Sequence, residues 1–163
     1  MSVRTGAMSR PPVSFAAGEQ EGPLVDDKSH FMTAIGDVAP QAVRADQGWV
    51  GMDIRFPLPP EVAREAGVAL FHALFKPGAQ HRAHIHPNAD EFFYVIRGHA
   101  EIGSGDEVYA VGAGTVEFVR RGAVHWLRNL DPQEEVEVLG GYLGVASLEE
   151  AGYEYVGEAG AQR

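Results

Sequence analysis

Short β-prone segments separated by glycines occupy most of this chain. The segments are rich in Val, Ile, Phe, Tyr and Trp, which favour strands, and glycines at positions 98, 103, 105 and 112 stand where turns are needed. The expected strands cover residues 49–56, 68–75, 81–86, 91–96, 100–102, 107–111, 115–119, 124–130 and 136–145. Many short strands with little helix between them predict an all-β sandwich or barrel.

Helix is expected in only two places. Prolines at positions 59 and 60 precede residues 61–66 and suit the start of one helical turn. The run Ser147-Leu148-Glu149-Glu150 has the pattern of a capping box and predicts a short C-terminal helix. Residues 1–28 are rich in Gly, Pro, Ser and Glu and are expected to form a flexible arm, and residues 157–163 a frayed tail. Residues 29–156 then form a single domain, since no internal repeat is evident.

Composition excludes several classes of protein. The chain has 163 residues, no cysteine and a formal net charge of −10. Disulfides and thiolate sites are therefore impossible, and the absence of a basic cluster makes nucleic acid an unexpected partner. No stretch approaches the roughly 20 apolar residues that span a bilayer, and no signal peptide is evident. We expect a cytoplasmic protein that does not insert into membranes.

Two histidines and a glutamate form the most informative cluster. His84 and His86 are two residues apart, so on a strand both imidazoles project from the same face. Glu91 follows a run suited to a turn and opens a β-prone segment, so a hairpin would return its carboxylate towards the two rings. His125, just after Gly122, offers a third imidazole. Imidazoles and a carboxylate are typical ligands of transition metals.

The spacing of these residues resembles the two motifs of the cupin superfamily. Residues Gly78, His84, His86, Glu91 and Gly98 fill every fixed position of the first motif, which spans Gly78–Gly98. Residues Gly114, Gly122, His125 and Asn129 match the second motif, Gly114–Asn129, whereas Arg120 stands where the family has proline. The resemblance implies a cupin jelly-roll β-barrel. It also implies one divalent metal, Fe, Mn, Ni or Zn, bound by His84, His86, Glu91 and His125.

Strand alternation predicts the residues around such a metal. If Glu91 points into the barrel, Phe93 and Val95 do too, and Leu127 follows His125 in the same way. On the strand at residues 68–75, one register turns Phe71 and Phe75 inward and the other turns His72 inward. We therefore take Phe93, Val95, Leu127 and His72 as candidate pocket residues. Arg82 and Arg120 are the candidates for binding an anion.

The resemblance and the intact ligand set favour a metal-dependent enzyme. Its expected substrate is a small oxygenated organic molecule that chelates the metal, and an oxygenase or lyase is the preferred reaction class. Glu91 is the candidate proton carrier. A polyketide cyclase, a sugar isomerase, or a non-catalytic small-molecule-binding cupin are the alternatives. Many cupins are dimers, and the segment from His30 to Phe56 has enough β character to pair with a second subunit, so we expect a homodimer.

Overall fold

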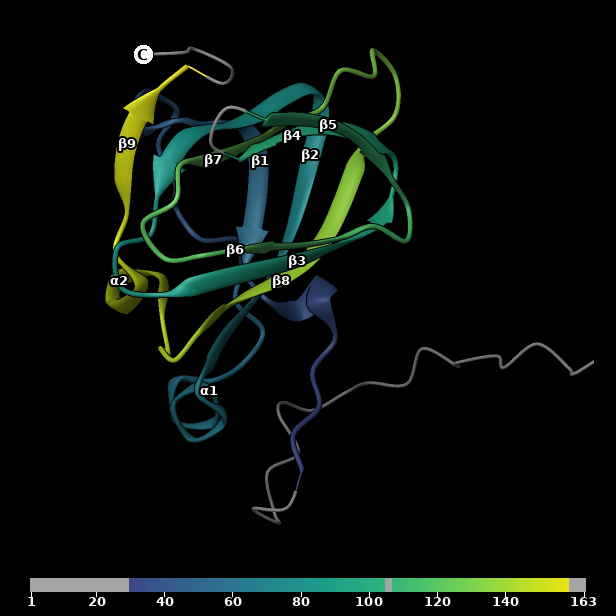
Figure 1. Ribbon diagram of the computed structural model, residues 1–163. Coiled ribbons are helices and arrows are strands. Elements are labelled where there is room, and N and C mark those ends of the chain that lie inside the picture. The colour runs from purple at the N-terminus through teal and green to yellow at the C-terminus, as the bar shows by residue number, and fades with distance from the viewer. Residues whose placement is uncertain (1–29, 105–106, 159–163) are drawn as a thin grey trace, which may run out of the picture. The chain divides into compact units, whose positions relative to one another are not determined.

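The computed structural model describes residues 30–104 and 107–158 (Figure 1). The expected arm at residues 1–28 lies outside the described residues, as does the tail beyond residue 158. The described strands are β1 (Trp49–Arg55), β2 (Val68–Ile85), β3 (Asp90–Arg97), β4 (His99–Ser104), β5 (Glu107–Gly112), β6 (Val116–Val119), β7 (His125–Arg128), β8 (Val136–Leu143) and β9 (Glu154–Gly157). The described helices are α1 (Pro60–Ala66), α2 (Leu148–Ala151) and the single 3-10 turns Ile35–Asp37 and Ala45–Gln47.

The strands form one curled antiparallel sheet with β2 at its centre. Its order is β5-β4-β7-β2-β8-β3-β6, and β1 and β9 also pair with β2. The first part of β2 pairs with β8 and the last part with β7, so this strand passes from one half of the barrel to the other. In Figure 1, β3, β6 and β8 lie along one side of the barrel and β4, β5 and β7 along the other. This arrangement confirms the predicted all-β jelly-roll fold.

Strand β2 differs from the prediction because it is continuous from Val68 to Ile85, where two separate strands were expected. Pro77 and Gly78, which fall between the two expected strands, lie inside it. The pairing with β1 instead shifts there: Val50 pairs with Gln80 and Met52 with Phe75, across a bulge. Proline is tolerated in a strand at such a bulge. The bulge lies where β2 passes from pairing with β8 to pairing with β7.

The core lies between these two halves. The structure decides the register of β2 that the sequence left open: Phe71, Ala73 and Phe75 are each at most 4% exposed and belong to the apolar core. Val95 and Val136 are completely buried in the same cluster. Burial of these side chains is the main stabilising contribution, about 1.5–3 kcal/mol for each large one.

The two predicted helices are present, and one strand was missed. In α2, the Ser147 hydroxyl accepts a hydrogen bond from the amide of Glu150, as the capping box predicts. Strand β9 pairs with the end of β2 and extends to Gly157, one residue beyond the domain boundary expected from the sequence. Glu158 then forms an ion pair with Arg82. Within residues 30–104 and 107–158, no helix combines the length and apolar character needed to cross a membrane.

Candidate metal centre

The end of β2 supplies two of the candidate ligands. His84 lies in the strand and His86 directly follows its last residue, Ile85, and both side chains turn to the inside of the barrel. Each is only 1% exposed. The two-residue spacing places them on one face, as the strand period requires. The sequence therefore predicted their common direction correctly.

The other two candidate ligands come from neighbouring strands. Glu91 is the second residue of β3, and His125 is the first residue of β7. His125 pairs in register with His84, which brings these two rings together. The amide of Gly122 donates a hydrogen bond of 2.9 Å to the carbonyl of His86, and this bond ties the loop before β7 to the end of β2. Strand pairing and this loop contact thus bring His125 to the end of β2, although about 40 residues separate them in the sequence.

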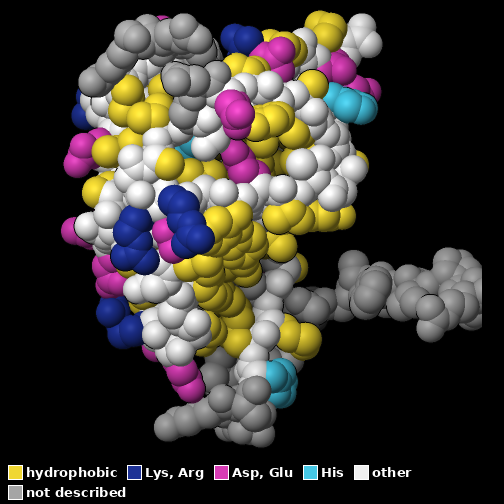
Figure 2. Space-filling view, viewed as in Figure 1, with side chains coloured by type: hydrophobic (Ala, Val, Ile, Leu, Met, Phe, Trp, Pro, Cys, Tyr) yellow, Lys and Arg dark blue, Asp and Glu magenta, His cyan; other side chains and the backbone are white. Residues whose placement is uncertain are grey.

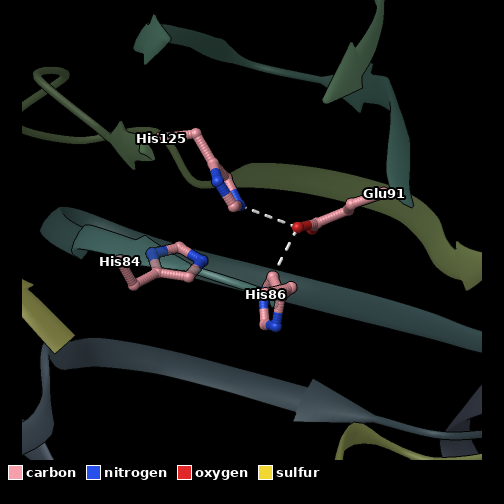
Figure 3. Close-up of side chains that lie close together, drawn as sticks. All are labelled: His84, His86, Glu91 and His125. Carbon is pink, nitrogen blue, oxygen red and sulfur yellow. Dashed lines mark hydrogen bonds and ion pairs between the residues drawn. The ribbon is translucent and has the colours of Figure 1, made fainter. Parts of the chain in front are cut away.

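The four side chains converge inside the barrel (Figure 3). One ligand atom from each of His84, His86, Glu91 and His125 lies within 4.8 Å of the others, and all four residues are buried. The Oε2 atom of Glu91 is 2.8 Å from Nε2 of His125 and 3.4 Å from Nε2 of His86. The donor atoms are therefore close enough together to surround a single ion.

Backbone carbonyl groups hold the three imidazoles in orientation. The Nδ1 atoms of His84, His86 and His125 lie 2.6, 2.6 and 3.0 Å from the carbonyl oxygens of Arg82, Gly152 and Ala123. A carbonyl only accepts, so each Nδ1 donates, and the neutral rings of His84 and His86 each keep a lone pair on Nε2. The Nε2 atoms of His84 and His86 are buried without a hydrogen-bond partner. Such imidazoles, oriented by a second hydrogen bond, fit a metal site.

Burial also favours the neutral, metal-binding form of His84 and His86. It lowers the pKa of His84 well below its ordinary value, helped by the neighbouring ring of His81. It lowers the pKa of His86 too, although the Glu91 carboxylate opposes the shift. At His125, burial again acts to lower the pKa, but the charge of Glu91 and its hydrogen bond outweigh it and the pKa is raised. Neutral rings at 84 and 86 keep their lone pairs available as ligands.

Comparison with known proteins identifies the family. A family model described as the cupin domain matches residues 71–140, a range that contains all four candidate ligands. Residues 71–140 therefore form a cupin domain. A search of curated proteins finds no match.

Solved structures show the same cupin fold at low sequence identity. A predicted oxalate decarboxylase from Thermotoga maritima is 19% identical, with a TM-score of 0.62 over 70% of this chain and 99% of that one. The polyketide cyclase RemF from Streptomyces resistomycificus is 20% identical, with a TM-score of 0.58 over 69% and 78%. Oxalate decarboxylase from Bacillus subtilis is 22% identical, with a TM-score of 0.61 over 76% and 31%. These likenesses concern the fold.

The cupin turn before His125 forms even though Arg120 replaces the usual proline. The amide of Ala123 donates a hydrogen bond of 3.0 Å to the carbonyl of Arg120, closing the turn. The Arg120 guanidinium lies over the Phe118 ring at 5.3 Å. At the end of the motif, the side-chain amide of the buried Asn129 donates to the carbonyls of Phe75, Lys76 and Glu134. Hydrogen bonds and packing thus replace the stiffness of proline here.

A mostly apolar cavity is lined by three of the four candidate ligands, His84, Glu91 and His125. It contains about 380 Å³ of empty space, part of it open to solvent. Phe93 and Leu127 line it, as predicted from alternation with Glu91 and His125. Its other lining residues are Met52, Ile54, Phe71, Ala73, Phe75, His81, His84, Glu91, His125, Trp126, Val138 and Tyr142. A ligand in this cavity would meet mostly carbon surface next to the imidazoles.

Two of the predicted pocket residues lie elsewhere. Val95 shares the inward face of β3 with Phe93 but is completely buried in the core and does not line the cavity. His72 points to the other face of β2, because Phe71 and Ala73 occupy the inward positions. Its Nε2 atom lies 2.7 Å from the carboxylate of Glu137, which is on the neighbouring strand β8 and pairs there with Leu74. His72 therefore belongs to a polar pair outside the cavity.

Two polar cavity residues were missed by the sequence reading. His81 is three residues before His84, and a regular strand would turn these two rings to opposite faces. The register with β7 shifts between them, so both rings face inward and stack with their centroids 3.7 Å apart. Tyr142 pairs with Glu91 across β8 and β3 and is 1% exposed. No sequence signal marks the bulge that turns His81 inward.

Neither arginine considered as an anion-binding residue lines the cavity. Arg82 forms an ion pair of 2.6 Å with Glu158, and Arg120 lies over Phe118. Among the described lining residues there is no lysine or arginine at all. Among the described lining residues, Glu91 is therefore the one that carries a formal charge, apart from any metal ion or ligand bound there.

A further carboxyl group, that of Glu117, makes the stability of the protein depend on pH. Glu117 pairs with Phe93 across β6 and β3. Burial raises its pKa from 4.5 to about 7, with His125 lowering it and Glu91 raising it further. Because the folded-state pKa lies above the unfolded value, ionised Glu117 costs stability above pH 7, and this cost disappears as the pH falls towards 4.5.

In the metal-free protein, we therefore expect Glu117→Gln to raise the free energy of unfolding at pH 8 by about 1 kcal/mol, after allowance for partial solvent exposure. The gain should vanish at about pH 3.5, where Glu117 is protonated in both the folded and the unfolded parent. Chemical denaturation at the two pH values measures the difference. An equal gain at both would show that packing, rather than ionisation, is responsible.

Proposed function

We propose that this cupin is a metal-dependent enzyme that acts on a small oxygenated organic substrate, as an oxygenase or lyase. The observation that carries the proposal is the buried group of three imidazoles and one carboxylate beside an apolar cavity. Two of its imidazole nitrogens are buried without a partner, which is costly unless something binds them. A site used only for packing would not need this arrangement.

His84, His86, Glu91 and His125 are the residues that would hold one divalent ion of Fe, Mn, Ni or Zn. When bound, such an ion supplies Lewis acidity and a template for a substrate with adjacent oxygen donors. The carbonyl groups of Arg82, Gly152 and Ala123 fix the imidazole orientation before any ligand arrives. Preorganisation of this kind reduces the cost of reaching the reactive geometry.

The remaining residues would position the substrate and exclude water. Phe93 and Leu127 line the apolar wall beside Glu91 and His125. A low-dielectric wall strengthens the electrostatic interactions inside it. Glu91 is the proposed proton carrier, acting at Oε2, which already lies 2.8 Å from Nε2 of His125. No separate nucleophile is needed for this chemistry.

The experiment that tests this function compares Glu91→Gln with the parent. Glutamine keeps the size of the side chain but cannot carry a proton as a carboxylate does. We expect the variant to retain most of its metal while losing about 100-fold or more in turnover of a chelating substrate. Metal analysis and turnover are measured on the same preparation.

Two other results would lead to different conclusions. Loss of both metal and turnover would make Glu91 a ligand without a role in proton transfer. A parent that binds metal but turns over no hydroxy acid, diketone or catechol would favour the non-catalytic binding cupin. The polyketide cyclase alternative draws support from the apolar cavity and from the likeness to RemF. The sugar isomerase has less support, because no lysine or arginine among the described lining residues could hold a phosphate.

A homodimer in the cytoplasm remains part of the proposal. Hydrophobic side chains gather over β3 and β6 (Figure 2). Tyr94, Val116 and Phe118 are 43%, 65% and 50% exposed there, and β6 lies at one end of the sheet order. An exposed apolar face at a sheet end favours association. Strand β1, in the segment first considered for pairing between subunits, pairs with β2 of its own chain.

We expect the parent to sediment as a dimer at micromolar concentration and the double variant Val116→Asp, Phe118→Asp to sediment as a monomer. Two charges on this face would have to be desolvated on association. Val108, which is 54% exposed on β5 at the other end of the sheet order, provides the control substitution Val108→Asp. A monomeric parent would exclude the homodimer.

A further inference from the structure

The histidine that the sequence reading passed over, His81, lies in the cavity wall. It is 8% exposed, and its Nε2 atom is buried without a hydrogen-bond partner. Its ring packs against the rings of Trp49 and His84, with ring centroids 3.9 and 3.7 Å apart. A buried polar atom without a partner is uncommon in folded proteins and asks for an explanation. His81 does not belong to the group whose ligand atoms converge within 4.8 Å.

Charge balance limits what the cavity can accept. A divalent ion held by three neutral imidazoles and the Glu91 carboxylate carries a formal charge of +1 (+2 − 1). A ligand with one negative charge would bring this sum to zero. A ligand with two would leave −1 among apolar side chains, and no lysine or arginine among the described lining residues could compensate it. An uncompensated charge in such surroundings is strongly disfavoured.

The cavity wall also favours a ligand with an apolar body. Phe71, Phe75, Phe93, Leu127 and Val138 line it. A ligand that covers this carbon surface gains from the removal of apolar area from water. A small dicarboxylate has no such surface to offer. Polar contact is available at the Nε2 atom of His81, a cavity-lining residue, because that atom has no hydrogen-bond partner.

We propose that the substrate is a chelator with a single negative charge and an apolar body, and that Nε2 of His81 makes a hydrogen bond to it. His81 thereby acts as a specificity-determining residue. This inference rests on the proposed function, since it requires a metal at the four ligands. The proposed substrate differs from oxalate, the dicarboxylate in the names of two structural neighbours, in its charge and in its apolar body.

Three hydroxy acids that share one chelating group test the proposal: mandelate, glycolate and tartronate. Mandelate adds a phenyl ring to the chelating group, and tartronate adds a second carboxylate instead. Binding to the nickel-loaded full chain is measured by calorimetry after its metal content has been determined. We expect mandelate to bind about tenfold or more tightly than glycolate, and tartronate to bind most weakly.

Variants of His81 test its contact with the ligand. His81→Leu should keep the nickel content and weaken mandelate binding by about tenfold, while His81→Asn, which retains a hydrogen-bonding group, should lose less. Equal mandelate affinity in the parent and a folded, nickel-loaded His81→Leu protein would overturn the role of His81.

Binding measurements on the parent protein test the substrate class independently of any His81 variant. Tighter binding of tartronate than of mandelate by the nickel-loaded parent would overturn this inference and leave the metal-dependent function standing. A parent that holds no nickel, iron, manganese or zinc would overturn both.

Discussion

Replacing His125 with alanine is expected to lower metal affinity by about 100-fold or more while the barrel stays folded, because removal of a ligand costs more than removal of its supporting hydrogen bond. His125 is the only candidate ligand on β7 and lies 2.8 Å from Glu91. Its loss would also leave the buried Glu91 carboxylate without this partner. Metal content is measured on protein purified without chelators, and folding by circular dichroism.

His72 provides a matched control for this experiment. It is also buried, and its Nε2 atom lies 2.7 Å from a carboxylate, that of Glu137, but the pair lies outside the ligand group. His72→Asn should therefore disturb a buried imidazole–carboxylate pair and leave metal content unchanged. Full metal occupancy in His125→Ala would contradict the assignment of the ligands. Loss of metal in both variants would point to general destabilisation.

Replacing Gly98 with alanine is expected to destabilise the protein by more than about 3 kcal/mol, through backbone strain and a steric clash together. Gly98 has a φ of +85°, in the left-handed region that favours glycine. A Cβ atom there would lie 2.4 Å from the carbonyl oxygen of Glu135 and 2.9 Å from Cα of Val136. These are backbone atoms, so no side-chain rotation relieves the clash.

Gly78 separates the two causes. It opens the same motif and has a φ of +75°, but a Cβ atom there meets nothing within 4 Å. Gly78→Ala should therefore show only the conformational cost, about 1–2 kcal/mol, partly offset by the lower entropy of the unfolded chain. Chemical denaturation of both variants measures the difference. Equal losses would mean that the contact with Glu135 adds nothing to the requirement for glycine at position 98.

The candidate ligands could be predicted from the sequence because their placement depends mainly on local rules. His84 and His86 share a face through the strand period, and the turn after His86 opens the strand that carries Glu91. Spacing relative to Gly122 identified His125 through the family resemblance. The structure brings all four within 4.8 Å of one another.

The cavity wall could be predicted only in part. Phe93 and Leu127 follow from alternation with the candidate ligands Glu91 and His125, whereas Val95 obeys the same rule and yet lies deeper, in the core. Alternation gives the face of a strand on which a residue lies and says nothing of how far along the strand the cavity extends.

The sequence by itself determined the fold class and the candidate ligand set, because glycine-separated β segments and the spacing of the candidate ligands are local features of the chain. Only the tertiary structure decided which face of β2 carries Phe71 and which carries His72. The inward face is the one whose apolar side chains are buried against the rest of the barrel. The tertiary structure also turned His81 inward, through a bulge in the pairing of β2 with β7. Pairing between distant strands sets such shifts, and a one-residue shift reverses the direction of every side chain beyond it.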